Sequence, residues 1–257
     1  MNANIIDCIQ GDATWLQCRI GCVTSSRVAA AISELKRKSG EKQPGDETAA
    51  REHLRFELMR EIMREQASDH YVSRWMEEGK EKEPLARAAY EFEKGVEARQ
   101  IGFAYHPTIK MAGCSPDALV GNDGGAEFKC PKTETHLRYL TAGVVPPEYR
   151  PQCYWQIDCM DWEWCDFMSH DPDMKKRQHR SLIVRLHRDE KIQADMRSKV
   201  IRFNDEVQEA IAKLDPDYIT DRLRESIAQA KARKNGGPQL IVSAMDEELM
   251  IGEEDCR

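Results

Sequence analysis

The chain has 257 residues, of which 40% are hydrophobic and 32% are charged, and its formal net charge is −7. This length suits one large domain or two small ones, and the composition is too apolar for a disordered chain and too polar for a membrane protein. No segment approaches the ~18 consecutive apolar residues of a membrane-spanning helix, and residues 1–10 lack the pattern of a secretory signal. None of the nine cysteines forms a CxxC pair, so we expect reduced thiols in a cytoplasmic protein.

The acidic excess gathers at the C-terminus. Residues 236–257 contain six acids and one arginine, which account for −5 of the net charge and leave −2 for the preceding 235 residues. The overall charge argues against a protein that coats nucleic acid nonspecifically, but it leaves room for a locally basic groove that binds DNA. Because Gly236-Gly237-Pro238 opens this segment, we predict a folded domain over 1–235 and a flexible acidic tail over 236–257.

The first third of the chain has helical patterns. Thr24, Ser25 or Ser26 is a suitable cap for a first helix that runs to Leu35. Apolar spacing predicts a second helix over about 47–66, and a third over 72–93 that is interrupted near Gly79 and Pro84.

The middle of the chain changes to short segments bounded by Gly and Pro, which are typical of strands. Strands are predicted at 101–105, 110–114, 118–120, 126–130, 164–169 and 182–186, with a hairpin turn at Asn122-Asp123-Gly124-Gly125. Helices are predicted at 133–140 and 148–160, and two more between 189 and about 234, broken near Pro216. The pattern predicts one α/β domain in which a central mixed β-sheet is flanked by helices.

One segment combines carboxylates and a lysine in a pattern that suits catalysis. Alternate residues of a strand share a face, so Glu127 and Lys129 point the same way while Phe128 points into a core. The hairpin brings Asp117 beside them. Two carboxylates are suitable ligands for a hard cation such as Mg²⁺, and a lysine beside the cation can orient the attacking water or stabilise a phosphorane. The combination favours phosphodiester hydrolysis.

The same residues have an ordinary structural interpretation. Glu-x-Lys is frequent in a chain with 32% charged residues, and a cross-strand acid–base pair on a solvated face has the same pattern. Pro-Asp is common at turns. A site is favoured because Pro-Asp, a hairpin and Glu-x-Lys occur together, at compatible offsets, in a sheet flanked by helices.

The order Pro-Asp followed by Glu-x-Lys is the signature of the PD-(D/E)xK nucleases, and the surrounding residues resemble their lambda-exonuclease or YqaJ-like viral recombinase branch. The resemblance spans roughly residues 8–210. Ala118 stands where the family usually has Gly, which questions the local backbone geometry but not the metal ligands. A further Asp171-Pro172 pair also fits the family. Four blocks match in order: Gly11–Trp15 with Arg19–Gly21 and Val23–Ser26; Gly79-Lys80 with Glu83; Cys114–Asp117 with Glu127–Pro131; and Pro147–Tyr149 with Gln152.

The resemblance implies a restriction-endonuclease-like core and a role for each matching residue. Asp117, Glu127 and the backbone carbonyl of Phe128 would bind the metal. Lys129 would position or activate the attacking water, and Glu83 would help to hold the metal or its water. Without the resemblance, Glu83 is one of several carboxylates on a solvated helix.

A second group of matching residues would bind the DNA end or border the site. Gln152 and Tyr149 match the helix motif beside the site, although Tyr149 also suits a core position. Arg19 matches the residue that binds the terminal 5′-phosphate, with Ser26 and Ser115 donating hydrogen bonds, since a guanidinium binds phosphate bidentately. A surface charge on a helix is the alternative for Arg19.

By resemblance, the protein is expected to be a Mg²⁺-dependent exonuclease, with Mn²⁺ as a substitute, that degrades one strand of linear double-stranded DNA from a 5′-phosphorylated end. It would leave 3′ single-stranded overhangs for phage-type recombination in a bacterial cell. The family also implies a homotrimeric ring and a single-strand annealing protein as partner. The alternatives are a structure-specific or restriction-like endonuclease on the same fold, and a catalytically inactive module that binds DNA ends.

Two further patterns carry weaker predictions. Cys153, Cys159 and Cys165 recur at six-residue spacing, which is ~240° on a helix, so we expect no iron–sulfur cluster, and the histidine spacing predicts no zinc site. Lys175-Lys176-Arg177 with Arg180 is interpreted as a solvated turn unless it borders the DNA cleft.

Overall fold

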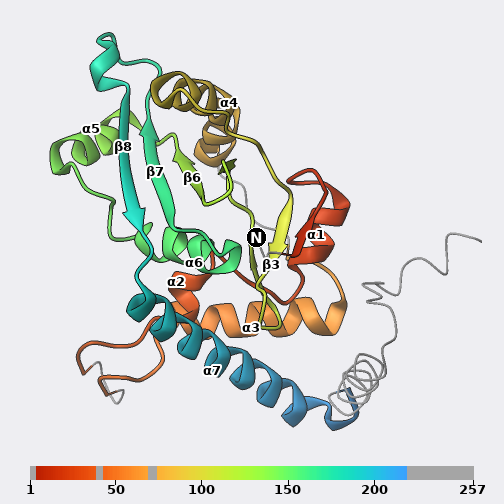
Figure 1. The fold of residues 1–257 in the computed structure, drawn as a ribbon. Coiled ribbons are helices and arrows are strands. Elements are labelled where there is room, and N and C mark those ends of the chain that lie inside the picture. Colours follow the sequence, from red (N-terminus) through yellow and green to blue (C-terminus); the bar gives the residue numbers. More distant parts are fainter. Residues whose placement is uncertain (1–3, 39–42, 69–73, 219–257) are drawn as a thin grey trace, which may run out of the picture. The chain divides into compact units, whose positions relative to one another are not determined.

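The computed structural model describes residues 4–38, 43–68 and 74–218 (Figure 1). The chain divides into two compact units, Met1–Ala210 and Ile211–Arg257, and the account below concerns the first. The predicted boundary at residue 235, the acidic tail and the last predicted helix lie outside the described residues and stay predictions. No helix in the described ranges is both long and apolar enough to cross a membrane.

The helices begin where the sequence offers caps. Asp12 accepts the N–H of Trp15 at 2.7 Å, and Thr48 accepts that of Arg51 at 3.1 Å, which satisfies main-chain donors that a first turn leaves open. The helices are α1 (Ala13–Arg19), α2 (Val28–Ala31), α3 (Ala49–Arg64), α4 (Arg74–Lys94), α5 (Thr133–Ala142), α6 (Arg150–Met160) and α7 (Glu190–Leu214), with a short 3₁₀ turn η1 (Arg177–His179).

Two of the helix predictions need correction. The helix expected from Thr24 to Leu35 is only the single turn α2. The interruption expected near Gly79 and Pro84 is wrong, because α4 continues through both residues. A proline inside a helix costs a main-chain hydrogen bond, and the burial of Ala86 and Tyr90 against the sheet on this helix offsets that cost.

The strands form two four-stranded mixed sheets, so the α/β class with mixed sheets flanked by helices is confirmed, although a single central sheet is not. The first sheet has the order β1-β3-β4-β2 and the second has the order β5-β6-β7-β8. In the second sheet β6 and β7 are parallel, and the outer pairs are antiparallel. The strands are β1 (Asn4–Ile6), β2 (Val23–Thr24), β3 (Phe103–Tyr105), β4 (Ala112–Cys114), β5 (Ala118–Val120), β6 (Gly124–Lys129), β7 (Trp164–His170) and β8 (Ser181–His187).

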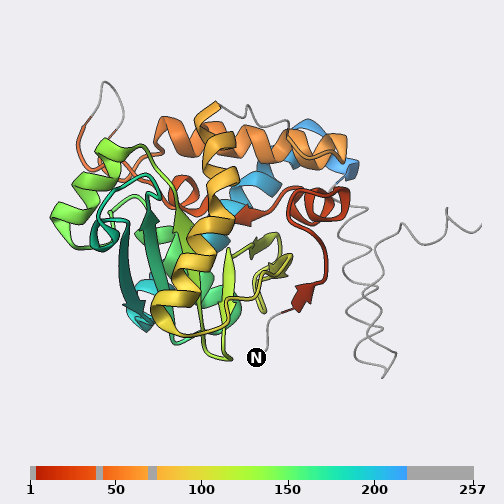
Figure 2. The same ribbon diagram turned by 90° about the horizontal axis from the view of Figure 1, so that it is seen from above.

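Helices cover both faces of the second sheet. Seen from above, α4 crosses one face (Figure 2), where Tyr90 of α4 packs against Phe128 of β6 with ring centroids 5.5 Å apart. On the other face, α5 and the start of α6 contact β7, and Tyr149 stacks on Phe167. Because side chains alternate along β6, Glu127 points away from α4, toward α6.

The hairpin between β5 and β6 turns one residue earlier than predicted. Val120 pairs with Gly124, so the turn is Gly121-Asn122-Asp123, and Gly121 adopts a φ of 62°. Gly124 and Gly125 are strand residues instead. A Cβ at Gly124 would lie 2.1 Å from the ring of Trp164, and one at Gly125 would lie 2.1 Å from that of Trp162. These two glycines are therefore needed because indole rings pack directly on the strand.

Candidate active site

The Glu127 carboxylate is almost completely buried, with 1% of the residue exposed, and three nitrogen donors hold it. Lys129 Nζ donates to Oε1 at 2.5 Å and Gln152 Nε2 donates to the same oxygen at 2.6 Å. Gln156 Nε2 donates to Oε2 at 2.5 Å. The lysine shares the strand face with Glu127, and the two glutamines, four residues apart, share one face of α6. Buried charge of this kind is stable only when it is paired and hydrogen-bonded.

Asp117 is joined to the same strand through the main chain. Its Oδ2 accepts the N–H of Phe128 at 2.7 Å. Strand β5 stops pairing at Ala118, opposite Ala126. Beyond that point this edge of β6 is not paired with β5, and the Asp117 carboxylate accepts the main-chain N–H that a strand would otherwise bind. The predicted approach of Asp117, Glu127 and Lys129 to one another therefore occurs in the structure.

The charges in this cluster influence one another strongly. Burial, and then the Glu127 carboxylate, raise the pKa of Asp117 well above its usual range. Burial by itself lowers the pKa of Lys129, but Glu127 and Asp117 outweigh it and the net shift is upward, so the ammonium stays protonated. Two carboxylates in mutual repulsion beside one ammonium form a site that a further cation would stabilise.

Glu83 approaches this cluster from α4. Burial raises its pKa; Arg87 opposes that shift and the charge of Glu127 adds to it. Arg87 Nη2 donates to Glu83 Oε1 at 3.2 Å. Both residues line a cleft of about 480 Å³ together with Gln10 and Trp15. The cleft therefore connects the carboxylate cluster with the region around α1.

Arg19 and Ser115 meet through Trp15 on that side. The indole N–H of Trp15 donates to Ser115 Oγ at 2.8 Å, and the Arg19 guanidinium lies 4.1 Å from the centroid of the same ring. Burial, and then the charge of Arg27, lower the pKa of Arg19 to about 10. Within the described part of the chain, Arg19 has no hydrogen-bond or ion-pair partner, although Arg27 is paired with Glu61. Arg19 is thus a partly buried cation with donors available for an anion.

Ser26 lies at the edge of the first sheet that also carries Ser115. Strands β2 and β4 are parallel, with Thr24 opposite Gly113, so the residues after them leave from the same edge. Ser26 is exposed and its Oγ lies 3.1 Å from Thr24 Oγ1. Ser26 and Ser115 each follow the aligned pair Thr24 and Gly113 by two residues, so they leave the sheet side by side. Among the described residues, Ser26 makes no hydrogen bond to Arg19.

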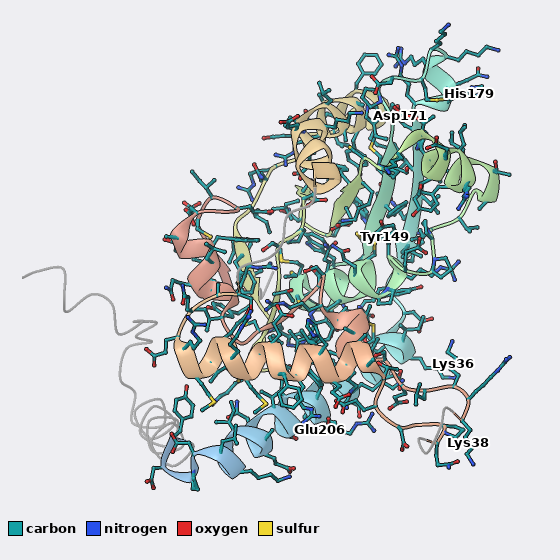
Figure 3. The ribbon with its side chains drawn as sticks, turned by 180° about the vertical axis from the view of Figure 1, so that it is seen from behind. Lys36, Lys38, Tyr149, Asp171, His179 and Glu206 are labelled. Atoms are coloured by element: carbon teal, nitrogen blue, oxygen red, sulfur yellow. The ribbon has the colours of Figure 1, made fainter. Side chains whose placement is uncertain are left out.

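Tyr149 borders the site and also packs on the core, which agrees with both positions that the sequence suggested for it, beside the site and in the core. Its ring stacks on Phe167 with centroids 5.3 Å apart, and Lys129 Nζ lies 5.3 Å from its centroid. Figure 3 shows Tyr149 at the start of α6, beside the sheet. The aromatic ring therefore forms part of the wall beside the lysine.

Sequence reasoning missed two polar residues of this site. Gln156 binds Glu127 as closely as Gln152 does, and Arg87 pairs with Glu83. Each lies four residues after a predicted site residue on the same helix, and that spacing was the available signal.

The site fits a hard divalent cation in its chemistry. Asp117 and Glu127 supply carboxylate oxygens. The N–H of Phe128 donates to Asp117, and the carbonyl of Phe128 points to this same edge of β6, where it supplies a further oxygen. Oxygen donors of this kind are the ligands of Mg²⁺. In the ranges that the structure covers, no three or more His, Cys, Asp or Glu side chains are grouped to hold a metal, so waters or phosphate would have to complete the coordination.

Of the three spaced cysteines, Cys159 lies against Cys114, and Cys165 against Cys153.

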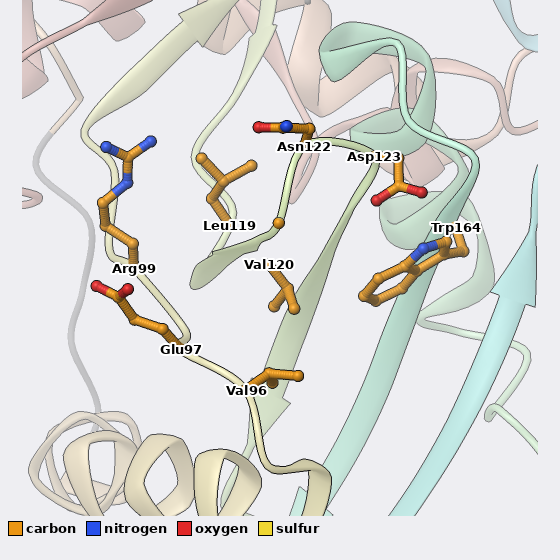
Figure 4. Close-up of a pocket in the computed structure, with 9 residues that line it drawn as sticks. Val96, Glu97, Arg99, Leu119, Val120, Asn122, Asp123 and Trp164 are labelled. Atoms are coloured by element: carbon orange, nitrogen blue, oxygen red, sulfur yellow. The ribbon is translucent and has the colours of Figure 1, made fainter.

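A second hollow, of about 620 Å³, lies at the turn end of the β5–β6 hairpin (Figure 4). Val96, Arg99, Asp123 and Trp164 are among the residues that line it. Asp117 and Glu127 belong to the open end of the same hairpin, so this hollow is separate from the carboxylate cluster.

Comparison with known proteins gives a consistent result. Residues 14–163 match the sequence model of the YqaJ-like viral recombinase domain. The crystal structure of the alkaline exonuclease LHK-Exo from Laribacter hongkongensis is 32% identical, with a TM-score of 0.70, and the match covers 80% of this chain and 97% of that one. The complex of LHK-Exo with dAMP matches with the same identity and coverage and a TM-score of 0.71.

A phage-related exonuclease from Haemophilus somnus 129PT has a TM-score of 0.55 at 13% identity, over 76% of this chain and 96% of its own. At that identity the likeness concerns the fold alone. No curated protein matched the sequence.

Proposed function

Because this chain belongs to the YqaJ-like viral recombinase family, we propose that it is a metal-dependent exonuclease that degrades one strand of linear double-stranded DNA from a 5′ end. The product would be a duplex with 3′ single-stranded overhangs, suited to recombination in a bacterial host. The observation that carries the proposal is the buried Glu127 carboxylate, held beside Asp117 and Lys129 at the edge of a parallel strand pair. Nuclease activity also agrees with the exonuclease that is 32% identical.

Asp117, Glu127 and the Phe128 carbonyl would hold the cation, for which we propose Mg²⁺ with Mn²⁺ as a substitute. Such a cation neutralises charge on the phosphate and lowers the pKa of bound water. Gln152 and Gln156 fix the orientation of Glu127 before any substrate arrives, so little reorganisation is needed at the reaction step.

Lys129 from β6 and Glu83 from α4 would both act on the reacting groups. The protonated Lys129 ammonium provides positive charge beside Glu127, where it stabilises negative charge that develops on the phosphate and orients the attacking water. Glu83 lines the cleft and would accept a hydrogen bond from that water.

Activity on matched substrates tests this function directly. Linear duplex should be digested in the presence of Mg²⁺ and not after chelation, whereas closed circular duplex should survive. Cleavage of the circle would indicate the alternative endonuclease. Stable binding to duplex ends without hydrolysis would indicate an inactive end-binding module.

We propose that Arg19 binds the terminal 5′-phosphate, with Ser115 and Ser26 as further donors. The Arg19 guanidinium is partly buried and has no hydrogen-bonded partner among the described residues. It packs on the Trp15 ring, whose N–H binds Ser115. A charge-assisted contact contributes on the order of 1.5–3 kcal/mol. Arg19→Ala should therefore lower initial rates on 5′-phosphorylated ends roughly 10- to 150-fold and leave the slower digestion of unphosphorylated ends nearly unchanged. An equal loss on both ends would assign Arg19 to folding or general DNA binding.

The resemblance to lambda exonuclease also leads us to propose a ring-shaped homotrimer that works with a single-strand annealing protein. A ring retains DNA without a strongly basic surface, which agrees with the net charge of −7. Light scattering on the purified chain should give three times the monomer mass.

A further inference from the structure

The loop between β7 and β8 leaves the sheet beside the candidate active site. Strands β6 and β7 are parallel, with Lys129 opposite Ser169, so their carboxyl ends lie at one edge of the sheet. In α/β proteins ligands bind at this edge. The loop begins at Asp171, two residues after Ser169, and η1 lies at its tip (Figure 1).

Contacts with α4 hold this loop near Glu83. Lys82, the residue before Glu83, pairs with Asp173 at 3.0 Å. Asp171 and Cys130 are also close enough to contribute to the pKa of Lys82. Further along α4, the ring of Phe92 lies 4.3 Å from the Arg177 guanidinium.

Contacts with α5 hold the other side of the loop. Thr133 Oγ1 donates to Asp171 Oδ2 at 2.7 Å. The buried His136 donates through Nε2 to the carbonyl oxygen of His179 at 2.8 Å. Figure 3 shows Asp171 at the base of the loop and His179 near its tip. The loop is therefore fixed at its base and near its tip, unlike a freely solvated turn.

The fixed loop carries an excess of positive charge toward its tip, beyond Asp171 and Asp173, which are bonded to Thr133 and Lys82. Residues 174–180, here called the basic loop, contain Lys175, Lys176, Arg177 and Arg180 and no acid. All four are exposed. The side-chain ammonium groups of Lys175 and Lys176 have no hydrogen bond or ion pair to any part of the chain that the structure describes. Such a cluster, in a chain with a net charge of −7, marks a local binding surface for an anionic polymer.

We propose that the basic loop binds the sugar-phosphate backbone of duplex DNA next to the nucleotide being cleaved. The inference rests on the proposed nuclease function and extends it by assigning a duplex-binding surface. Lysines provide point charges for phosphates and carry no sequence information, which suits an enzyme that must move along any sequence. Their contacts would keep the duplex aligned while the strand end changes.

The test is the salt dependence of DNA binding by the full-length protein, measured by fluorescence anisotropy with a labelled blunt duplex and a chelator to prevent digestion. Each phosphate contact contributes about 0.9 to the slope of log Kd against log salt. The variant Lys175→Gln/Lys176→Gln should therefore reduce that slope by about 1.8. It should also slow digestion of long duplexes in the presence of Mg²⁺.

The matched control is Lys191→Gln/Lys199→Gln, which removes the same charge from α7. Strand β8 runs antiparallel to β7, so α7 begins at the sheet edge opposite the basic loop. This control should keep the wild-type slope. Both variants should unfold near the wild-type temperature, because Lys175, Lys176 and Lys191 are exposed and the surface pair of Lys199 with Asp195 contributes little to stability. If both variants lose the same slope, or neither does, the basic loop is not a DNA contact even if the wild type digests DNA. If the wild type does not digest linear duplex, the nuclease function itself fails.

Discussion

Replacing Gln156 with leucine should test whether Glu127 is held in the structure as a buried anion. Gln156 is fully buried and donates to Glu127 Oε2 at 2.5 Å. Leucine has a similar volume, so the change removes the donor without opening a large cavity. The Glu127 carboxylate, 1% exposed, then has no partner for that oxygen.

The expected loss follows from the charge on the acceptor. A hydrogen bond to a charged group contributes about 1.5–3 kcal/mol. For a protein of this size, 1 kcal/mol corresponds to a shift in melting temperature of about 2–4 °C, so Gln156→Leu should unfold roughly 3–12 °C below the wild type. Activity should fall about 10- to 100-fold, as is typical when a residue that orients a metal ligand is removed.

The matched control is Gln152→Leu, measured by the same circular-dichroism melts in the absence of metal. Gln152 also donates to Glu127, but it is only partly buried, so water can replace its amide. Its melting temperature should fall less than that of Gln156→Leu, while its activity also drops. Equal melting temperatures for Gln156→Leu and the wild type would refute the view that Glu127 is held as a buried anion.

The other predictions concern the lysine, a buried histidine and the tail. Lys129→Ala should abolish digestion but retain metal binding by calorimetry, and near-normal turnover would contradict its role. Burial lowers the pKa of His170 below its ordinary 6.5, so the unfolded chain binds a proton at this residue more readily than the folded chain does. The free energy of unfolding should therefore decline as the pH falls below about 6.5. Urea titrations of His170→Gln should show a weaker decline, and a decline identical to that of the wild type would contradict this prediction. Deleting residues 236–257 should leave digestion of short duplexes unchanged, whereas an insoluble or inactive product would mean that the segment packs on the domain.

Strand periodicity was enough to predict the central part of the site. Alternation along one strand places Glu127 and Lys129 on one face and Phe128 in the core, and the structure confirms this arrangement. The hairpin signal also brought Asp117 to the same strand, where it binds the main chain. These predictions succeed because they depend on local geometry and a short turn.

Contacts between distant segments were beyond the reach of pattern reasoning. That Gln156 binds Glu127 depends on how α6 packs against β6, and no local rule gives that distance. The continuity of α4 through Pro84 likewise depends on burial of Tyr90 against the second sheet. The division of the strands into two sheets depends on pairing over long separations, which a single sequence does not encode as a period.

The glycine pair at the start of β6 makes the candidate site sensitive to substitutions at the turn end of the hairpin. Gly124 and Gly125 lie under the rings of Trp164 and Trp162, so a mutation to alanine at either position forces the strand to move away from the indole. Glu127 follows Gly125 by two residues on the same strand, so this displacement would change the distances from its carboxylate to Gln152 and Gln156. A methyl group at the turn end of the hairpin could therefore disturb the geometry of the candidate site in a lineage whose sequence keeps every residue of that site.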